Sequence, residues 1–187
     1  MRKAFIIICL SLGGFYLYSS GYMLIKAELS QFFIKKAWLK TLKDKHNHKP
    51  WSWADTYPIL EFNVPRINKT SYVLQGQSGR NMAFSAVHLN SSGMPGESKS
   101  TVISGHNDSH FNYLKEVQNG DIIYIHDKNQ SYSYIVTSIN IVNSKQEKLN
   151  IRNVNELILT TCYPFDNLQF GSDLRYVIFA DSISRKI

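Results

Sequence analysis

Three residues in the second half of the chain have the side chains needed for nucleophilic catalysis by a cysteine. Cys162 follows the apolar run "LILTT", Arg175 comes thirteen positions later, and His106 follows the run "TVISG". A thiolate is the reactive form of cysteine, and a neighbouring imidazole can carry its proton. A guanidinium can lower the pKa of the thiol and stabilise an oxyanion. These residue types predict acyl transfer through a thioester, provided that the fold brings them together.

Each of these residues also has an ordinary structural interpretation. A lone cysteine after an apolar run is commonly a small buried hydrophobic residue. An arginine in a strand commonly lies on the surface. His110, four positions after His106 in a possible short helix, is a competing proton carrier, and His88 and His126 lie elsewhere in the same part of the chain. Residue types alone leave these alternatives open.

The elements that must position these residues are short runs of β-type sequence, which begin after Pro50 and are separated by turn residues. In "YSYIVTSINIV" the alternation places Ile135, Ile139 and Ile141 on one face of a strand. Many short strands with little helix predict a mainly β fold, either a closed barrel or a sandwich. The expected strands are 59–64, 72–74, 83–88, 101–104, 121–126, 132–142, 157–161 and 174–180.

The last two expected strands give a geometric reason to associate the cysteine with the arginine. If they form an antiparallel pair, Cys162 and Arg175 flank a twelve-residue connection and lie opposite each other at its base. Arg175 would then share a strand face with Val177 and Phe179. The aromatic residues of the connection, Tyr163, Phe165 and Phe170, are therefore candidates to line a substrate site.

The first 25 residues have the pattern of a membrane anchor. Residues 4–25 form an uncharged run of 22 residues, which at ~1.5 Å per residue would span about 30 Å of hydrocarbon. Tyr16, Tyr18 and Tyr22 would suit the interface at its far end. A cleaved signal peptide is the alternative, although its apolar region is ordinarily shorter. We therefore expect an uncleaved single-pass anchor over residues 1–25.

Residues 26–49 contain no glycine or proline and predict a basic juxtamembrane helix or linker before the folded domain, 50–187. Leu29, Phe32 and Phe33 share one side of this helix, but Lys36 and Lys40 fall there too. The expected amphipathicity is therefore poor. His46 and His48 have no further metal ligand near them in the sequence, and we expect neither a metal site nor a cofactor.

The net charge of +7 is concentrated at the start of the chain. Residues 1–49 contain nine Lys or Arg and two acidic residues, whereas residues 50–187 contain twelve of each sign. We therefore expect a membrane surface, and not a nucleic acid, as the anionic partner. A disulfide is not expected, because Cys9 lies within the apolar run and is poorly placed to pair with Cys162.

The motifs around the three reactive residues resemble those of a known enzyme family, the sortases. "LILTTCYPF" is similar to the cysteine strand end of sortases, "VISGHND" to their histidine strand end and "LRYVIFA" to their arginine strand. "SGMPGESKSTVISGH" is similar to the stretch in which a Pro-Gly loop precedes the histidine. "WSWADTYPI", "SGHND" and "TCYPFD" further resemble the class GN sortases of Gram-negative bacteria. The resemblance covers roughly residues 50–184.

The resemblance implies a closed β-barrel of about eight strands with short helices, and a cysteine transpeptidase. It implies that Cys162 is the nucleophile, His106 the general acid and base, and Arg175 the group that stabilises the oxyanion or the substrate. Thr161, which precedes the cysteine, would contact the substrate. Asn107 stands where many sortases have arginine, so the resemblance leaves the substrate preference open.

The implied activity is that of an enzyme held in the bacterial inner membrane, with its domain on the extracytoplasmic, periplasmic side. It would cleave the C-terminal sorting signal of an exported protein and transfer that protein to an amine acceptor. A hydrolytic cysteine protease with the same three residues is one alternative. The other is a non-catalytic, membrane-anchored binding module in which Cys162 is inert.

Overall fold

The structure, a computed structural model, describes residues 13, 29–165 and 172–183. The expected anchor therefore lies almost wholly outside the described residues. Within the part of the chain that is described, no helix is both long and apolar enough to cross a bilayer.

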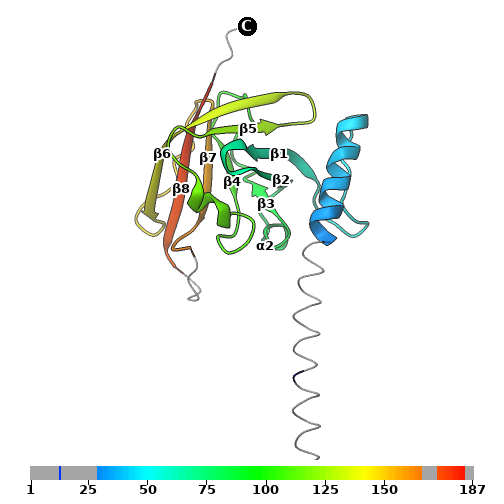
Figure 1. Cartoon of the computed structure of the whole chain (residues 1–187), viewed down its shortest axis with the longest axis horizontal. Coiled ribbons are helices and arrows are strands. Elements are labelled where there is room, and N and C mark those ends of the chain that lie inside the picture. Colours follow the sequence, from blue (N-terminus) through cyan, green and yellow to red (C-terminus); the bar gives the residue numbers. More distant parts are fainter. Residues whose placement is uncertain (1–12, 14–28, 166–171, 184–187) are drawn as a thin grey trace, which may run out of the picture.

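The fold is a closed β-barrel with the strand order β1-β2-β3-β4-β7-β8-β6-β5 (Figure 1). Each of the eight predicted strands overlaps one of the observed strands, so the mainly β barrel is confirmed. Three short helices interrupt them: η1 (Pro65–Ile67), α2 (Gly79–Met82) and η2 (Asn112–Glu116). The strands are β1 (Pro58–Val64), β2 (Lys69–Gln75), β3 (Ala86–His88), β4 (Thr101–Ser104), β5 (Ile122–His126), β6 (Ser131–Asn143), β7 (Glu156–Cys162) and β8 (Leu174–Ser182).

Three neighbouring strands, β4, β7 and β8, form the part of the barrel that concerns function. β4 and β7 run parallel, with Ser104 opposite Thr160. β7 and β8 run antiparallel, with Cys162 opposite Arg175. The ends of β4 and β7 and the start of β8 therefore meet at the same edge of the barrel.

Alternation along β7 separates an inner face from an outer face. Leu157 and Leu159 are fully buried in the main core, inside the barrel. Ile158 instead belongs to a smaller cluster with Val102 and Val177, which lies on the opposite face of the same strands. Because side chains alternate along a strand, Cys162 lies on the outer face, four residues after Ile158.

Strand β6 departs from the predicted alternation. Its register with β8 shifts between Val136 and Ser138, which indicates a β-bulge. The bulge changes the face of the residues that follow, so Ile139 packs against the main core while Ile135, on the other side of the bulge, is exposed. The prediction that Ile135, Ile139 and Ile141 share one face is therefore wrong.

Residues 29–44 form a helix that stands beside the barrel, next to β1 and β2 (Figure 1). Ile34 and Trp38 are fully buried, and the Trp38 indole donates to the Glu61 carboxylate of β1 at 2.8 Å. The helix thus has a distinct apolar stripe, which the expectation of poor amphipathicity did not include. The side of the helix with Leu29 and Phe32 is exposed.

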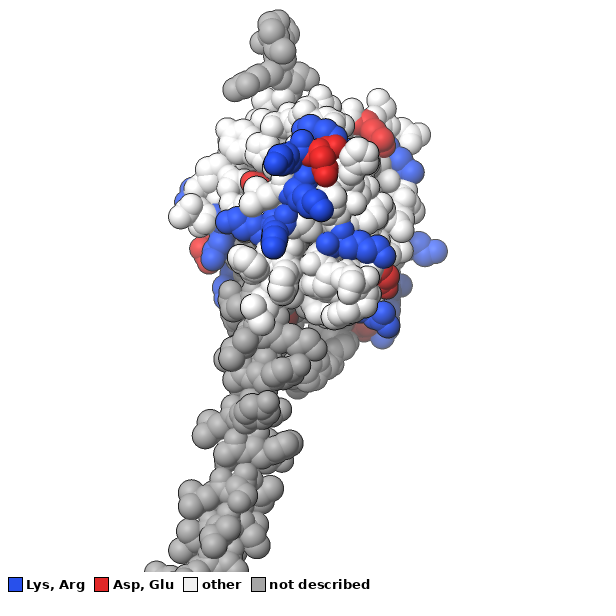
Figure 2. Space-filling view, turned by 90° about the vertical axis from the view of Figure 1, so that its right-hand side faces the viewer, with Lys and Arg blue, Asp and Glu red and all other residues white. Residues whose placement is uncertain are grey.

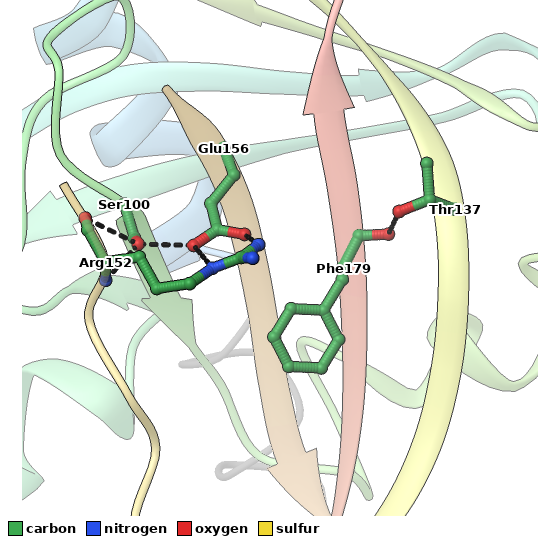
Figure 3. A network of polar contacts seen from close by, with 5 residues as sticks. All are labelled: Ser100, Thr137, Arg152, Glu156 and Phe179. Atoms are coloured by element: carbon green, nitrogen blue, oxygen red, sulfur yellow. Dashed lines mark hydrogen bonds and ion pairs between the residues drawn. The ribbon is translucent and has the colours of Figure 1, made fainter. Parts of the chain in front are cut away.

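A closed polar network joins β4 and β7 where these strands begin (Figure 3). Glu156, the first residue of β7, has a side chain only 1% exposed. Its carboxylate accepts from the Ser100 hydroxyl at 2.5 Å and from Arg152 Nε at 3.0 Å. Burial alone would raise the pKa of Glu156, but the hydrogen bonds from Arg152 and Ser100 outweigh it and lower that pKa. The network therefore holds Glu156 ionised and fastens this edge of the barrel.

Candidate active site

Cys162 and Arg175 are direct neighbours across the β7–β8 ladder. They form the last pair of its antiparallel register. Residues that face each other in such a pair have Cβ atoms about 4.5–5.5 Å apart. Val177 and Phe179, two and four residues after Arg175, belong to the outer-face cluster. The geometry predicted for the hairpin is therefore confirmed, and thiol and guanidinium share the outer face.

His106 comes to the same edge from β4, on the other side of β7. The backbone N–H of Gly105 donates to the Thr160 carbonyl at 3.3 Å, and the Thr161 hydroxyl donates to the Gly105 carbonyl at 2.7 Å. These bonds hold the end of β4 against the end of β7. The register of β4 with β7 ends at Ser104 and Thr160, and each segment continues for two residues, to His106 and to Cys162, toward the same edge of the barrel.

Glycine is required at position 105 because an aromatic ring lies against it. A Cβ on Gly105 would be 2.9 Å from the ring of Phe111, a residue of the main core. The Phe111 N–H also donates to the His106 carbonyl at 2.9 Å. The chain after His106 is thereby turned back onto the barrel, and His106 remains exposed.

The competing histidines have other surroundings. His110 Nε2 lies 3.3 Å from the Ala83 carbonyl, beside α2, and burial lowers the pKa of His110. His88 is buried, with Nε2 2.9 Å from the Gly93 carbonyl, and its pKa is also lowered by burial. His126 bonds to Ser131 within the β5–β6 hairpin. The strand ends therefore favour His106 over His110 as the partner of Cys162.

The Arg175 side chain is held at the start of β8 by the backbone carbonyls of two residues that precede it. Its Nη1 donates to the carbonyls of Ser172 at 2.6 Å and Leu174 at 2.9 Å. The side chain is half-buried and borders a hollow of about 260 Å³ on the outer face. Val177 and Phe179 form the floor of this hollow, and residues 147–150 of the β6–β7 connection form part of its wall. An extended chain entering the hollow would pass beside the guanidinium.

Asn107 joins the histidine end to the cysteine end, a contact that the sequence analysis did not predict. Its side-chain amide donates to the carbonyl of Pro164, two residues after Cys162, at 2.8 Å. Its own carbonyl accepts from the Asn112 side chain at 2.9 Å. The position next to His106 was the available signal, but the partner lies 57 residues away in the sequence.

The four residues expected to contact substrate differ in their surroundings. Thr161 is buried, and its hydroxyl joins the ends of β4 and β7, so its side chain lies on the inner face, away from Cys162. Tyr163 and Phe165 form an aromatic cluster with Tyr176, with ring centroids 5.0–6.2 Å apart. Phe165 and Tyr176 pack on the main core. Phe170 lies outside the described residues.

The arrangement brings a thiol, an imidazole and a guanidinium to one edge of the barrel. Cys162 and Arg175 are half-buried, and His106 is exposed. Among the described residues, no group of three or more His, Cys, Asp or Glu side chains could hold a metal ion. The chemistry that these three side chains can carry is acyl transfer through a thioester.

Comparison with known proteins gives one consistent family. The chain is 28% identical to sortase D of Bacillus subtilis over 144 residues, which cover 76% of this chain and 71% of that protein. The structure is similar to sortase A of Corynebacterium diphtheriae, with a TM-score of 0.62 and 25% identity, over 71% of this chain and 63% of that one. The chain thus spans less than two thirds of the length of that sortase A structure.

A third relative extends the match of the fold. The sortase D5 transpeptidase of Clostridium perfringens has a TM-score of 0.67 over 84% of this chain and 99% of its own, at 16% identity. The family model of the sortase domain matches residues 62–183, which include all three reactive residues. The chain therefore belongs to the sortase family of cysteine transpeptidases.

Proposed function

We propose that this protein is a membrane-anchored sortase that cleaves the C-terminal sorting signal of an exported protein and transfers that protein to an amine acceptor. The observation that carries the proposal is the row of His106, Cys162 and Arg175 across the adjacent strands β4, β7 and β8. Backbone pairing joins Cys162 to Arg175, and His106 follows β4, which pairs with β7. These strands therefore support positioning of the three residues at one edge before a substrate binds.

In the first half of the reaction, the Cys162 thiolate attacks the carbonyl carbon of the scissile peptide bond. Arg175 and nearby backbone N–H groups stabilise the oxyanion of the tetrahedral intermediate. As the C–N bond breaks, protonated His106 gives its proton to the leaving amine. A thioester then joins Cys162 to the exported protein.

In the second half, the acceptor amine attacks the carbonyl carbon of the thioester. His106 takes a proton from that amine, and the C–S bond breaks to release the Cys162 thiolate. A new amide joins the exported protein to its acceptor. Thiolate and imidazolium are then restored, so the catalytic cycle needs no cofactor.

The hollow beside Arg175 supports a site for the sorting signal. Its apolar floor of Val177 and Phe179 would accept side chains of an extended peptide, while Arg175 lies at the rim nearest to Cys162. Asn107, which stands where many sortases have arginine, follows His106 just after the end of β4. We propose on the motifs "WSWADTYPI", "SGHND" and "TCYPFD" that the chain is of the class GN type.

The proposed location is the extracytoplasmic side of the bacterial inner membrane. The uncharged run of residues 4–25 supports an anchor there, and the exposed lysines of the helix that follows suit an anionic membrane surface. An anchor would hold the site near substrates in the same membrane and raise their effective concentration.

The test is a product analysis with the full chain, reconstituted in lipid, and candidate exported proteins with a C-terminal motif, an apolar span and a basic tail. We expect cleavage with an amine acceptor to give the amide-linked product, and denaturation during turnover to trap a thioester on Cys162. Cleavage that gives only the hydrolysis product with abundant amine would identify a protease instead. A Cys162 that resists alkylation in the folded protein, without any cleavage, would identify a binding module.

A further inference from the structure

An exposed group of apolar side chains lies where the helix of residues 29–44 begins. We call it the aromatic surface and define it by the exposed Leu29, Phe32, Phe33 and Trp53 and the half-buried Phe84. Trp53 is 64% exposed, Phe32 60% and Leu29 49%. Trp51 lies behind it, half-buried, with its ring centroid 5.1 Å from Trp53 and 4.9 Å from Phe84.

This surface is assembled from three separate parts of the chain. Phe33 comes from the helix, Trp53 from the segment before β1, and Phe84 from the end of α2. The Gln31 side chain bonds to the Phe84 carbonyl and joins two of these parts. Between the rings lies an apolar hollow of about 240 Å³, lined by residues of the helix and by Trp51, Trp53 and Phe84. A contiguous exposed apolar area of this kind marks an interaction site.

The outward side of the helix changes from apolar to basic along its length. Leu29, Phe32 and Phe33 occupy its first described turns, and the exposed lysines Lys36, Lys40 and Lys43 follow on the same side, with Leu39, which is 53% exposed, at its margin. At ~1.5 Å per residue, Lys36 lies about 10 Å and Lys43 about 21 Å beyond Leu29 along the axis. Figure 2 shows this face of the molecule, where basic side chains lie mainly across the middle and upper parts and few acidic ones lie between them.

This order corresponds to the layers of a membrane boundary. Tryptophan and other aromatic side chains favour the interface between hydrocarbon and water, whereas lysines favour the level of the anionic head groups and beyond. The uncharged run ends at Ile25, four residues before Leu29. Four residues reach at most about 14 Å even when fully extended, so an anchor formed by this run would hold the aromatic surface at the bilayer.

We propose that the aromatic surface docks onto the lipid interface of the membrane that holds the anchor, and thereby fixes the orientation of the barrel. The proposal deepens the proposed function and rests on its anchor. A second copy of the chain or a protein partner would have to displace lipid from a surface that the anchor already places there.

The aromatic surface lies close to the loop that carries His106. His110 Nε2 lies 3.3 Å from the carbonyl of Ala83, the residue before Phe84. The same loop carries His106, whose carbonyl accepts from the Phe111 N–H. The segment of Phe84 and the loop of His106 are therefore in contact, and docking would hold this loop close to the lipid surface, where substrates tethered in the membrane are found.

The test uses fluorescence quenching of the full chain reconstituted in vesicles of phosphatidylcholine, with bromine near the head-group end of the acyl chains. Trp51→Phe leaves Trp53 and the buried Trp38, and Trp51→Phe/Trp53→Phe leaves Trp38 alone. We expect brominated lipid to lower the emission of the first variant by at least a quarter and that of the second by less than a tenth. Equal quenching of both variants, or none in either, would overturn the proposal, as would loss of the Trp53 quenching on formation of a dimer.

A second experiment measures whether docking affects cleavage. The quenching experiment can be interpreted without its result. We expect Trp53→Ser/Phe33→Ser to lower cleavage of a membrane-tethered substrate about tenfold while leaving cleavage of the same signal as a soluble peptide unchanged. Ile141→Ser, at a residue of β6 that is 50% exposed, is the matched control and should change neither. A wild-type chain that cleaves neither substrate would contradict the proposed function, whereas the quenching result would still decide the docking.

Discussion

At the start of β7, Glu156 is almost fully buried, and its carboxylate is bonded to Ser100 and Arg152 (Figure 3). At the other end of the same strand, Cys162 is half-buried, with Arg175 opposite it on β8 and the end of β4 on its other side. The first site satisfies its charge within the protein. The second is assembled by the same strands but lies at the open edge, and its Arg175 lines a hollow of about 260 Å³ that extends to Arg152.

The difference between the two ends is one of burial and partners. Glu156 and Arg152 form a closed pair, because leaving a buried carboxylate without partners costs several kcal/mol. Arg175 instead donates to backbone carbonyls, which are neutral, so its positive charge is not cancelled by them. We therefore expect one end of β7 to contribute mainly to stability and the other to react with a substrate.

The largest expected effect on activity is that of removing the Cys162 thiol. Cys162→Ala should lower kcat/KM at least ~10³-fold, because no other group replaces the nucleophile. The midpoint of thermal unfolding should change by no more than about 2 °C, since the side chain is small and half-buried. Product analysis and thermal unfolding of the same preparation test both values, and retained thioester formation would contradict the mechanism.

The second largest effect is expected from a change in the shape of the cationic side chain at Arg175. Arg175→Lys keeps the charge but loses the planar guanidinium and its two carbonyl bonds. We expect kcat to fall about 10²-fold, as it does when a donor to an oxyanion is removed. Arg80→Lys, at an exposed arginine of α2, is the matched control and should leave kcat unchanged. Equal kcat for Arg175→Lys and the wild type would exclude a geometric role.

The third prediction concerns the free energy of unfolding and the buried site of Glu156 at the start of β7. Glu156→Gln should lower the free energy of unfolding by about 2 kcal/mol, because the charge-assisted bonds to Ser100 and Arg152 become weaker. The activity per folded molecule should stay within twofold of the wild type. Glu147→Gln, at an exposed position of the β6–β7 connection, should leave the unfolding free energy unchanged. Chemical denaturation of the three proteins measures the difference.

A smaller effect is expected where Asn107 joins the two reactive strand ends. Asn107→Ala removes the bond to the Pro164 carbonyl, so His106 and Cys162 should be less well aligned. We expect kcat to fall about tenfold with little change in KM. Asn63→Ala, which removes the bond from Asn63 to Thr70 at a distant strand pair, should change neither value. A rise in KM alone would indicate that Asn107 contacts substrate instead.

The smallest expected effect is the pH dependence of the stabilisation that Glu156 contributes. Because the pKa of Glu156 is lowered in the folded protein, the stabilisation is complete above its ordinary value of 4.5. It is lost as the pH falls through the lowered pKa. The difference in unfolding free energy between the wild type and Glu156→Gln should therefore be constant near neutral pH and shrink below about pH 4.5. A difference that stays constant down to pH 3 would contradict this assignment.

The local sequence pattern was enough to predict the strands and, in the site, the pairing of Cys162 with Arg175. Alternation and turn residues located all eight strands to within a few residues, because burial on one face imposes a period of two. The hairpin of β7 and β8 also followed, since a short connection favours pairing of its two flanking strands. That pairing predicted Arg175 beside Cys162.

The position of His106 in the site depended on contacts between distant segments of the chain. Neither alternation nor spacing shows that β4 lies parallel to β7, and the choice between His106 and His110 depends on that neighbour. The bulge in β6 was also missed, because an extra residue shifts the register without changing the composition of the strand. The bond from Asn107 to Pro164 spans 57 residues.

The sequence by itself determined which side chains could react, where the strands lie and which strand end bears each reactive residue. These properties follow from residue chemistry and from the period of the strand. The tertiary structure decided that β4 and β7 are neighbours, that His106 reaches the edge shared by Cys162 and Arg175, and that Leu29, Trp53 and Phe84 form one surface. Such contacts arise from closure of the barrel and packing of the helix, in which residues far apart in the chain exclude water together.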